Sequence, residues 1–325
     1  MTGLSVALGL WQDRPPTDAL VTAWLADELG FTQLWIGEMA TYDAFALATA
    51  VGLRTSRIGL TIGPLAVGVR DPVTIAMGAA SVSDLTGRRV AVALGSSSPV
   101  VVEQWHGRSR LRPARMLAET ACAVRTLLDG GRVALDGEVV RATGYRLRLP
   151  PVPGPLTVAA FGHAAVRVAA RHADRLVVAL VTPASAGRLV AELGVAAQRA
   201  QRGRPSTAAW VPVAVTREPR AAVAQVRRML AGYFAAPGYA DMFTEAGFGH
   251  VVAQATAGTP AKDLLAVIPD AAVAAVAAIG APEVVEARLG AYAEHVDEVV
   301  ALVCCTDDDP VGETTLRHLA SWTAP

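Results

Sequence analysis

Short apolar runs alternate with longer segments of helical spacing from the start of the chain. Leu4–Leu10 is an apolar run, and Asp18–Leu29 then places its leucines on one helical face. Gly30 follows directly, as is typical of a helix C-cap. The same pair of elements recurs along most of the chain. Strands that alternate with helices of this length predict right-handed βαβ units and a parallel sheet.

The pattern defines eight strands, each but the last followed by a helix. The expected strands are Leu4–Leu10, Leu34–Gly37, Ile58–Ile62, Val90–Gly95, Leu156–Ala160, Arg175–Val181, Ala209–Val215 and Glu298–Cys304. The expected helices are Asp18–Leu29, Ala44–Arg54, Pro72–Leu85, Arg112–Leu128, Ala164–His172, Ala184–Arg202, Ala221–Ala231 and Pro282–His295. Eight such units predict an α/β fold, a single (β/α)8 TIM barrel over residues 1–325.

Two segments interrupt the alternation. Residues 131–155 read as a hairpin that closes in the sequence PPVPGP, and we interpret them as an insertion between units. Residues 232–269 are rich in glycine and irregular, and we expect a mobile cap or an inserted helical patch there. Both segments are predicted to decorate the barrel.

Composition and charge exclude several classes of protein. Hydrophobic residues make up 52% of the chain, but the most apolar segment, Ala271–Ile279, is far shorter than the roughly 20 residues of a membrane span. With no signal-peptide pattern, we expect a soluble cytoplasmic protein. The net charge is zero, which argues against nucleic acid and membrane partners. The three cysteines have no zinc or disulfide spacing, and no metal is expected.

In a barrel of this kind the active groups lie at the carboxyl ends of the strands. The residues at those ends are Trp11, Gln12, Asp13, Glu38, Met39, Ile62, Gly63, Pro64, Gly95, Ser96, Ser97, Ser98, Phe161, Gly162 and His163. The Gly-Ser turn exposes backbone N–H groups without side-chain bulk. A flat heteroaromatic ring over these strand ends, with a phosphate at the start of the helix after Gly162, would use all of them. Simpler roles stay open: Glu38 as a helix cap, Trp11 as packing and His163 as a solvated side chain.

Four ordered motifs give the chain a family resemblance. They are LGF-x-x-x-W-x-x-E (29–38), I-G-P-L-x-V-x-x-R-D-P (62–72), the Gly95–Ser98 turn with W-H-G (105–107), and F-G-H-x-x-x-R-x-A-x-R-x-A-D (161–174). This set resembles the bacterial luciferase-like superfamily, and within it the oxidoreductases that use the deazaflavin coenzyme F420. The likeness extends over nearly the whole chain.

The resemblance implies roles for these residues. A non-proline cis peptide, here Ile62–Gly63, would support the coenzyme ring, and the Gly95–Ser98 turn would face it. Gly162, His163 and Ala164 would bind the coenzyme phosphate, and Glu38 would lie near the polar edge of the ring. Sugar-phosphate dehydrogenases of the family carry a His where this chain has Met39, and a Glu where it has Ser98. That activity is therefore not expected.

The expected reaction is hydride transfer from the reduced coenzyme to a small organic substrate with a C=N or C=C bond, in secondary metabolism. Such a substrate needs a proton donor. The candidates are Gln12, Asp13, Glu38, Tyr42 and His106, with Glu38 and His106 favoured. An apolar mouth suits a neutral substrate; its residues are Trp11, Met39, Tyr42, Leu65, Trp105 and Phe161.

Two alternatives stay open. One is an FMN-dependent two-component monooxygenase, and the other is a non-catalytic coenzyme-binding barrel. The resemblance also implies a homodimer formed through helices of the first half of the barrel. The apolar helix Pro72–Leu85 suits such an interface, although core packing explains its composition equally well.

Overall fold

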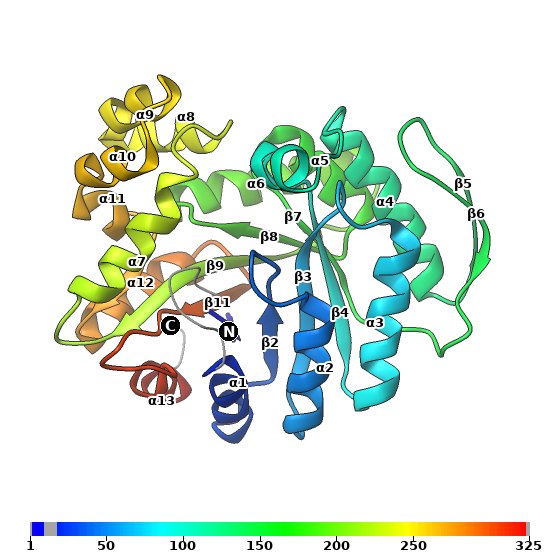
Figure 1. Ribbon diagram of the computed structural model, residues 1–325, viewed down its shortest axis with the longest axis horizontal. Helices are drawn as coiled ribbons and strands as arrows, with labels where there is room; N and C mark the ends of the chain where they lie inside the picture. The colour runs from blue at the N-terminus through cyan, green and yellow to red at the C-terminus, as the bar shows by residue number, and fades with distance from the viewer. Residues whose placement is uncertain (1, 10–17, 323–325) are drawn as a thin grey trace.

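The computed structural model describes residues 2–9 and 18–322. Eight parallel strands close into a barrel in the order β1-β2-β3-β4-β7-β8-β9-β11, and β11 pairs back with β1 (Figure 1). The strands are β1 (Gly3–Ala7), β2 (Gln33–Ile36), β3 (Gly59–Ala66), β4 (Val90–Gly95), β7 (Leu156–Ala159), β8 (Arg175–Ala179), β9 (Ser206–Val215) and β11 (Glu298–Val303). The (β/α)8 TIM barrel predicted from the sequence is confirmed.

Helices cover the outside of the barrel. They are α1 (Ala19–Glu28), α2 (Ala44–Arg54), α3 (Pro72–Thr86), α4 (Pro113–Leu128), α5 (His163–His172), α6 (Pro183–Arg199), α7 (Arg220–Ala231) and α12 (Pro282–Ala293). Local chemistry fixes several starts: Asp43 and Asp71 each accept two backbone N–H bonds as N-caps of α2 and α3. Pro72 occupies the first turn of α3, where a missing N–H costs nothing.

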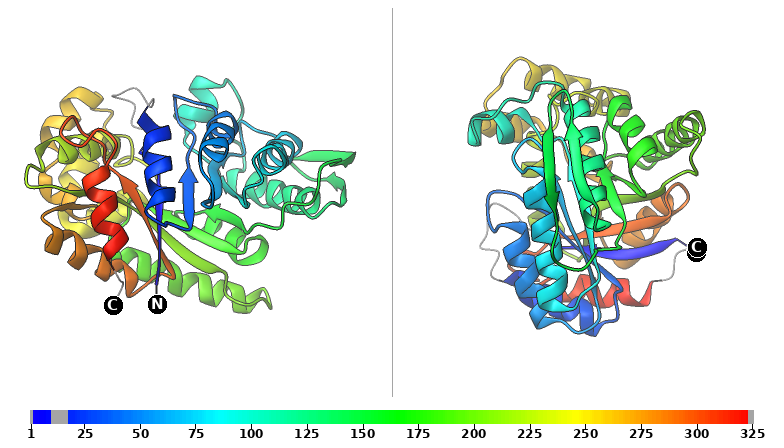
Figure 2. Two further views of the ribbon diagram at one scale, coloured as in Figure 1. Left: turned by 90° about the horizontal axis from the view of Figure 1, so that it is seen from below. Right: turned by 90° about the vertical axis from the view of Figure 1, so that its right-hand side faces the viewer.

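The insertion at residues 131–155 forms an antiparallel hairpin, as expected. Its strands are β5 (Arg132–Asp136) and β6 (Arg141–Arg146), and they lie across α3 and α4 on the side of the barrel (Figure 2, right). The buried carboxylate of Glu119 on α4 accepts backbone N–H bonds from Glu138, Val139 and Val140 in the hairpin turn. One side chain thus ties the turn to the barrel.

The second insertion is mostly helical in the structure, so of the two expected forms the helical patch is observed. It contains α8 (Tyr239–Phe243), the π-helix η3 (Thr244–Phe248), α9 (Gly249–Thr256), α10 (Ala261–Val267) and α11 (Asp270–Ala274). The chain then returns to the sheet in β10 (Ala278–Gly280), which pairs with Val213–Val215 of β9 outside the closed barrel.

Three elements were missed by the sequence pattern. The last strand is followed by a helix after all, α13 (Glu313–Ser321), which packs near α1, where Thr22 donates a hydrogen bond to the Val311 carbonyl. β10 has only three residues. The π-helix η2 (Val100–Trp105) follows the Gly95–Ser98 turn, in a stretch for which no element was predicted. β10 and η2 are short, and hydrophobic periodicity carries little signal over so few residues.

A polar cluster fills one layer of the barrel interior. The buried guanidinium of Arg175 on β8 pairs with Glu298 on β11 at 2.6 Å and lies over the Trp35 ring. Thr61 and Thr157 accept further hydrogen bonds from Arg175. Since these side chains come from β2, β3, β7, β8 and β11, the cluster connects strands across the barrel.

No helix within residues 2–9 and 18–322 is both long and apolar enough to cross a membrane.

Candidate active site

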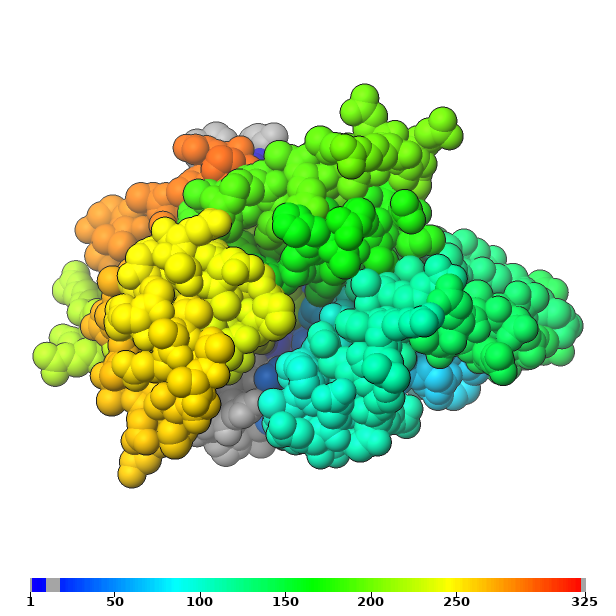
Figure 3. Space-filling view, turned by 90° about the horizontal axis from the view of Figure 1, so that it is seen from above, coloured from blue at the N-terminus to red at the C-terminus, as the bar shows by residue number. Residues whose placement is uncertain are grey.

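The carboxyl ends of the strands open on the face seen in Figure 3. The surface there is hollowed between the helical insertion, drawn in yellow, and the segment after β4, drawn in cyan. Loops that follow β2, β3, β4 and β7 reach this face, and each carries residues that the sequence singled out. This face is called the mouth below.

Glu38, directly after β2, is fully engaged by hydrogen-bond donors. Arg70 donates from Nε to Glu38 Oε2 at 2.9 Å and from Nη2 to Oε1, and the Ala44 N–H at the start of α2 donates to Oε1 at 3.1 Å. The simpler role as a helix cap is therefore present, together with an ion pair to Arg70. A general acid must donate a proton to the substrate. Glu38 instead accepts all of these hydrogen bonds, so its surroundings favour a structural role.

Arg70 also pairs with Asp43, and its guanidinium lies 5.1 Å from the centroid of the Phe45 ring. The hydrogen bonds that Arg70 donates to Glu38, opposed by burial and aided by Asp43, raise the pKa of Arg70 above its ordinary value. Burial alone would raise the pKa of Asp43, but the Ala46 N–H and Arg70 outweigh burial and lower it. The Asp43 and Arg70 side chains therefore stay ionised together at neutral pH.

At the end of β3 the position predicted for the cis peptide bond is wrong. The cis peptide bond is Gly63–Pro64, one bond later than the expected Ile62–Gly63, and it precedes a proline. Gly63 has φ +119°, and a Cβ there would lie 2.2 Å from the Ala93 carbonyl oxygen. Ile62 and Leu65 have no exposed surface. Leu65 therefore belongs to the core in this structure, and Pro64 is the half-buried residue of this turn.

The end of β4 is flat. A Cβ added to Gly95 would meet the Pro64 Cβ at 3.3 Å and the Ala159 Cβ at 3.7 Å, so three small groups from β3, β4 and β7 form one platform. Ser96 and Ser97 are half-buried beyond it, and Ser98 is exposed and accepts a 3.3 Å hydrogen bond from the Val101 N–H.

The chain continues from this turn into η2. Trp105 is half exposed at its end, and His106 is exposed next to it. Met39 and Tyr42, in the loop after β2, are exposed to a similar extent. These apolar side chains are available to a ligand, in contrast to Leu65.

Strand β7 leads into the start of α5. Gly162 is the N-cap with φ 113°, and nothing lies within 4 Å of a Cβ placed there. His163 is exposed, with Nδ1 2.7 Å from Glu192 Oε2, and Ala164 is exposed beside it. The first N–H groups of any α-helix lack acceptors inside the helix and attract anions.

Phe161 is half-buried and stacks on Tyr239 of α8, with ring centroids 3.5 Å apart. The Tyr239 hydroxyl donates a 2.7 Å hydrogen bond to the Ala179 carbonyl at the end of β8. Burial raises the pKa of Tyr239 well above its ordinary value, so this hydroxyl keeps its proton. The helical insertion is thus attached to two strand ends.

Trp210 of β9 underlies the mouth next to Gly37, where a Cβ would lie 3.4 Å from its ring. Its edge meets Trp35 with ring centroids 5.6 Å apart. The indole Nε1 is buried and has no hydrogen-bond acceptor among the residues that the structure describes. Trp35 itself is fully buried below.

Trp11, Gln12 and Asp13 lie outside the described residues, so their predicted roles as pocket wall and proton donors stay predictions. Conversely, sequence reasoning missed Arg70, Trp210 and Tyr239. Arg70 stands inside the quoted I-G-P-L-x-V-x-x-R-D-P motif, so an arginine shortly after a strand end was an available signal. Trp210 and Tyr239 gave none, because an aromatic residue in a strand or short helix is most often core.

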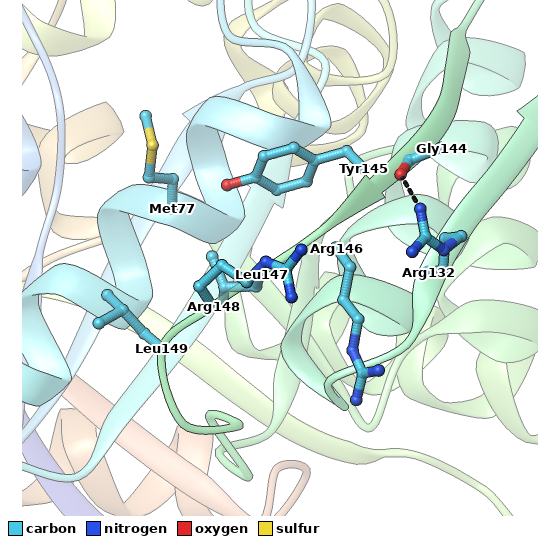
Figure 4. A pocket seen from close by; sticks show the side chains of 8 residues that line it. All are labelled: Met77, Arg132, Gly144, Tyr145, Arg146, Leu147, Arg148 and Leu149. Carbon is cyan, nitrogen blue, oxygen red and sulfur yellow. Dashed lines mark hydrogen bonds between the residues drawn. The ribbon is translucent and has the colours of Figure 1, made fainter.

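A separate cavity of about 440 Å³ lies between α3 and the hairpin (Figure 4). Met77 and Tyr145 form part of its wall, with Arg132, Arg146 and Arg148 around it. None of the residues predicted for the site lines this cavity, and it lies on the flank of the barrel. It is therefore distinct from the mouth.

Comparisons with known proteins relate the chain to one family and one fold. The profile of the luciferase-like monooxygenase family matches residues 4–298. A proposed coenzyme F420-dependent oxidoreductase of Mycobacterium tuberculosis is 28% identical over 279 residues, which are 78% of this chain and 80% of that protein.

Two solved structures share the fold. One is the coenzyme F420-dependent tetrahydromethanopterin reductase from Methanopyrus kandleri, with a TM-score of 0.80, 18% identity and 98% of each chain covered. The other is the oxygenating constituent of 3,6-diketocamphane monooxygenase from Pseudomonas putida in complex with FMN. It has a TM-score of 0.71 and 16% identity, and covers 100% of this chain and 98% of its own.

Proposed function

The chain belongs to the luciferase-like monooxygenase family, and from this premise we propose that it is an F420-dependent oxidoreductase. It would transfer a hydride between the deazaflavin and a small organic substrate, reducing a C=N or C=C bond in secondary metabolism. The choice of coenzyme is supported by the Mycobacterium tuberculosis relative, whose likeness extends over four fifths of that protein.

The observation that carries the proposal is the shape of the mouth. The platform of Pro64, Gly95 and Ala159 offers a flat ring a surface free of large side chains. The start of α5 offers backbone N–H groups and open space at Gly162 for a phosphate. This arrangement therefore fits a coenzyme in which a flat ring and a phosphate are joined by a flexible chain.

In this proposal the reduced coenzyme supplies a hydride, and the protein holds the acceptor carbon against the ring face. Ser96, Ser97, Ser98 and Phe161 would contribute to the ring site through backbone or side-chain contacts, and the buried Ile62 and Gly63 would support it from below. Gly162, His163 and Ala164 would contribute to the phosphate site. Glu38 would order the loops at the ring edge, since all its contacts donate to it. His106, exposed beside Trp105, is then the proton donor that we favour among the described residues.

The exposed apolar side chains of Met39, Tyr42 and Trp105 favour a neutral substrate with apolar surface. We propose a homodimer in the cytoplasm as its working form, with no nucleic acid or membrane partner. An FMN-dependent monooxygenase is the second candidate, because FMN-binding relatives share this fold.

The test is titration with F420 and, separately, with FMN, followed by tryptophan fluorescence. We expect micromolar or tighter binding of F420 and weak binding of FMN. A Gly95→Val variant places a side chain on the platform and is expected to weaken F420 binding at least about tenfold, or about 1.4 kcal/mol. Gly203→Val is the matched control, because nothing lies within 4 Å of a Cβ at Gly203.

The reverse preference would establish the FMN-dependent alternative. Binding of neither coenzyme would overturn both. Tight F420 binding without turnover on a panel of cyclic imines and enones would point to a non-catalytic coenzyme-binding barrel.

A further inference from the structure

The loop between β2 and α2 has a short segment, residues 39–42, that carries two exposed apolar side chains at the mouth. Met39 is 46% exposed and Tyr42 is 42% exposed. The segment has no regular secondary structure and its four residues are exposed, and such loops open more easily than helices and strands.

Both ends of this segment are tied to the start of α2. Glu38, before it, accepts the Ala44 N–H at 3.1 Å, and Asp43, after it, accepts two N–H bonds at 2.9 Å each as the helix N-cap. The two carboxylates therefore come close together, and two like charges repel one another unless a cation stands between them.

Arg70 is that cation. Its guanidinium reaches Glu38 through two nitrogens and Asp43 through one, so a single side chain joins both ends of the segment. The Phe45 ring packs against the same guanidinium. Lysine cannot reproduce this, because an ammonium is a point charge without the planar fork of arginine.

The backbone of Arg70 is itself fixed. Its N–H donates to the Ala66 carbonyl at 3.0 Å, and the next residue, Asp71, caps α3. Arg70 is thus anchored to β3, the strand that carries Pro64. Through its bonds to Glu38 and Asp43 it fixes the position of the loop after β2 relative to the turn after β3.

We propose that Arg70 is a positioning residue that clamps residues 39–42 and thereby sets the affinity of the mouth for the coenzyme. This inference rests on the proposed function. Arg70 acts through Glu38 and Asp43, and through the Met39 and Tyr42 side chains that the loop presents.

The experiment measures the Kd of oxidised F420 for the full chain and four variants. Arg70→Lys is expected to raise Kd about tenfold and Arg70→Gln more. Hydrogen exchange of amides 39–43 is expected to speed up in both. Arg115→Lys is the matched control, because Arg115 also bridges two carboxylates, Glu119 at 2.6 Å and Glu138 at 2.8 Å, away from the mouth. We expect it to leave Kd within about twofold.

Asp43→Asn distinguishes positioning from direct contact. Asparagine keeps the N-cap but removes one arm of the clamp, so positioning predicts a raised Kd. If Arg70 instead bound the coenzyme directly, freeing it from Asp43 would lower Kd, and the inference would be wrong. An unchanged Kd in Arg70→Lys would also overturn it. Failure of the unmodified chain to bind F420 would instead refute the proposed function.

Discussion

Among single residues, Gly63 combines a positive φ with a lack of space for any side chain. Its φ of +119° is strained for any residue with a side chain, and the Ala93 carbonyl and the Leu65 N–H leave no space for a Cβ. Both neighbours are backbone atoms of barrel strands, so they cannot move aside as a flexible side chain would.

We expect Gly63→Ala to lower the free energy of unfolding by at least about 3 kcal/mol, from strain and overpacking together. Urea unfolding followed by circular dichroism measures this. Gly87→Ala is the control, since Gly87 has φ +67° but nothing within 4 Å of a Cβ. In Gly87→Ala only the left-handed backbone conformation lowers the free energy of unfolding, by about 1–2 kcal/mol. Equal losses in the two variants would show that the space at Gly63 adjusts.

On the scale of elements, the hairpin depends on one carboxylate of α4. Burial would raise the pKa of Glu119, but N–H bonds from Val139, Val140 and Glu138, with help from Arg115, lower it from 4.5 to about 2. A carboxyl group whose pKa is lower in the folded than in the unfolded state stabilises the protein at pH values above its unfolded-state pKa. The contribution of Glu119 is therefore present well above pH 4.5, and it is lost as the pH falls through 4.5 toward 2.

Glu119→Gln is therefore expected to cost about 2–3 kcal/mol at pH 7, because a charged acceptor of several buried hydrogen bonds is lost. The difference from the unmodified chain should shrink between pH 5 and pH 2. Unfolding by urea at several pH values gives both quantities. Glu138→Gln serves for comparison, since the Glu138 side chain is half exposed and its ion pairs are with the exposed Arg112 and Arg115. A pH-independent difference would exclude the proposed role of Glu119.

The longer elements could be predicted because their signals are local. Pro72 at a first turn and the spacing of leucines within a helix identify α3 and α1 without tertiary information. The site could be predicted less completely: Glu38 and Gly162 were found at strand ends, whereas the partner of Glu38, Arg70, lies on another loop. The position of a cis bond next to Gly63 likewise depends on how β3 packs against β4, which no local pattern encodes.

For the whole molecule, the cluster around Arg175 and Glu298 fills one layer of the barrel interior with charged and polar side chains. The pair connects β8 and β11, and Trp35 covers the guanidinium with its centroid 4.5 Å away. Removing one partner of a buried ion pair leaves an uncompensated charge, whereas removing both does not.

We expect Arg175→Met to cost about 3–5 kcal/mol and the double variant Arg175→Met/Glu298→Gln to cost less than the sum of the two single changes. A double-mutant cycle from urea unfolding gives the coupling free energy. Additive losses would mean that Ser5 and Trp35, which also contact Glu298, compensate for the missing guanidinium.

The pairing of β10 with the end of β9 separates the helical insertion from the closed barrel. After the helical insertion the chain re-enters the sheet on an extension of β9 that lies beyond the closed barrel, before α12 begins. Residues 232–277 therefore lie between α7 and β10 without adding a strand to the closed barrel. An exchange of this segment that keeps the Tyr239 contacts with Phe161 and the Ala179 carbonyl would change what the mouth admits and leave the closed barrel as it is.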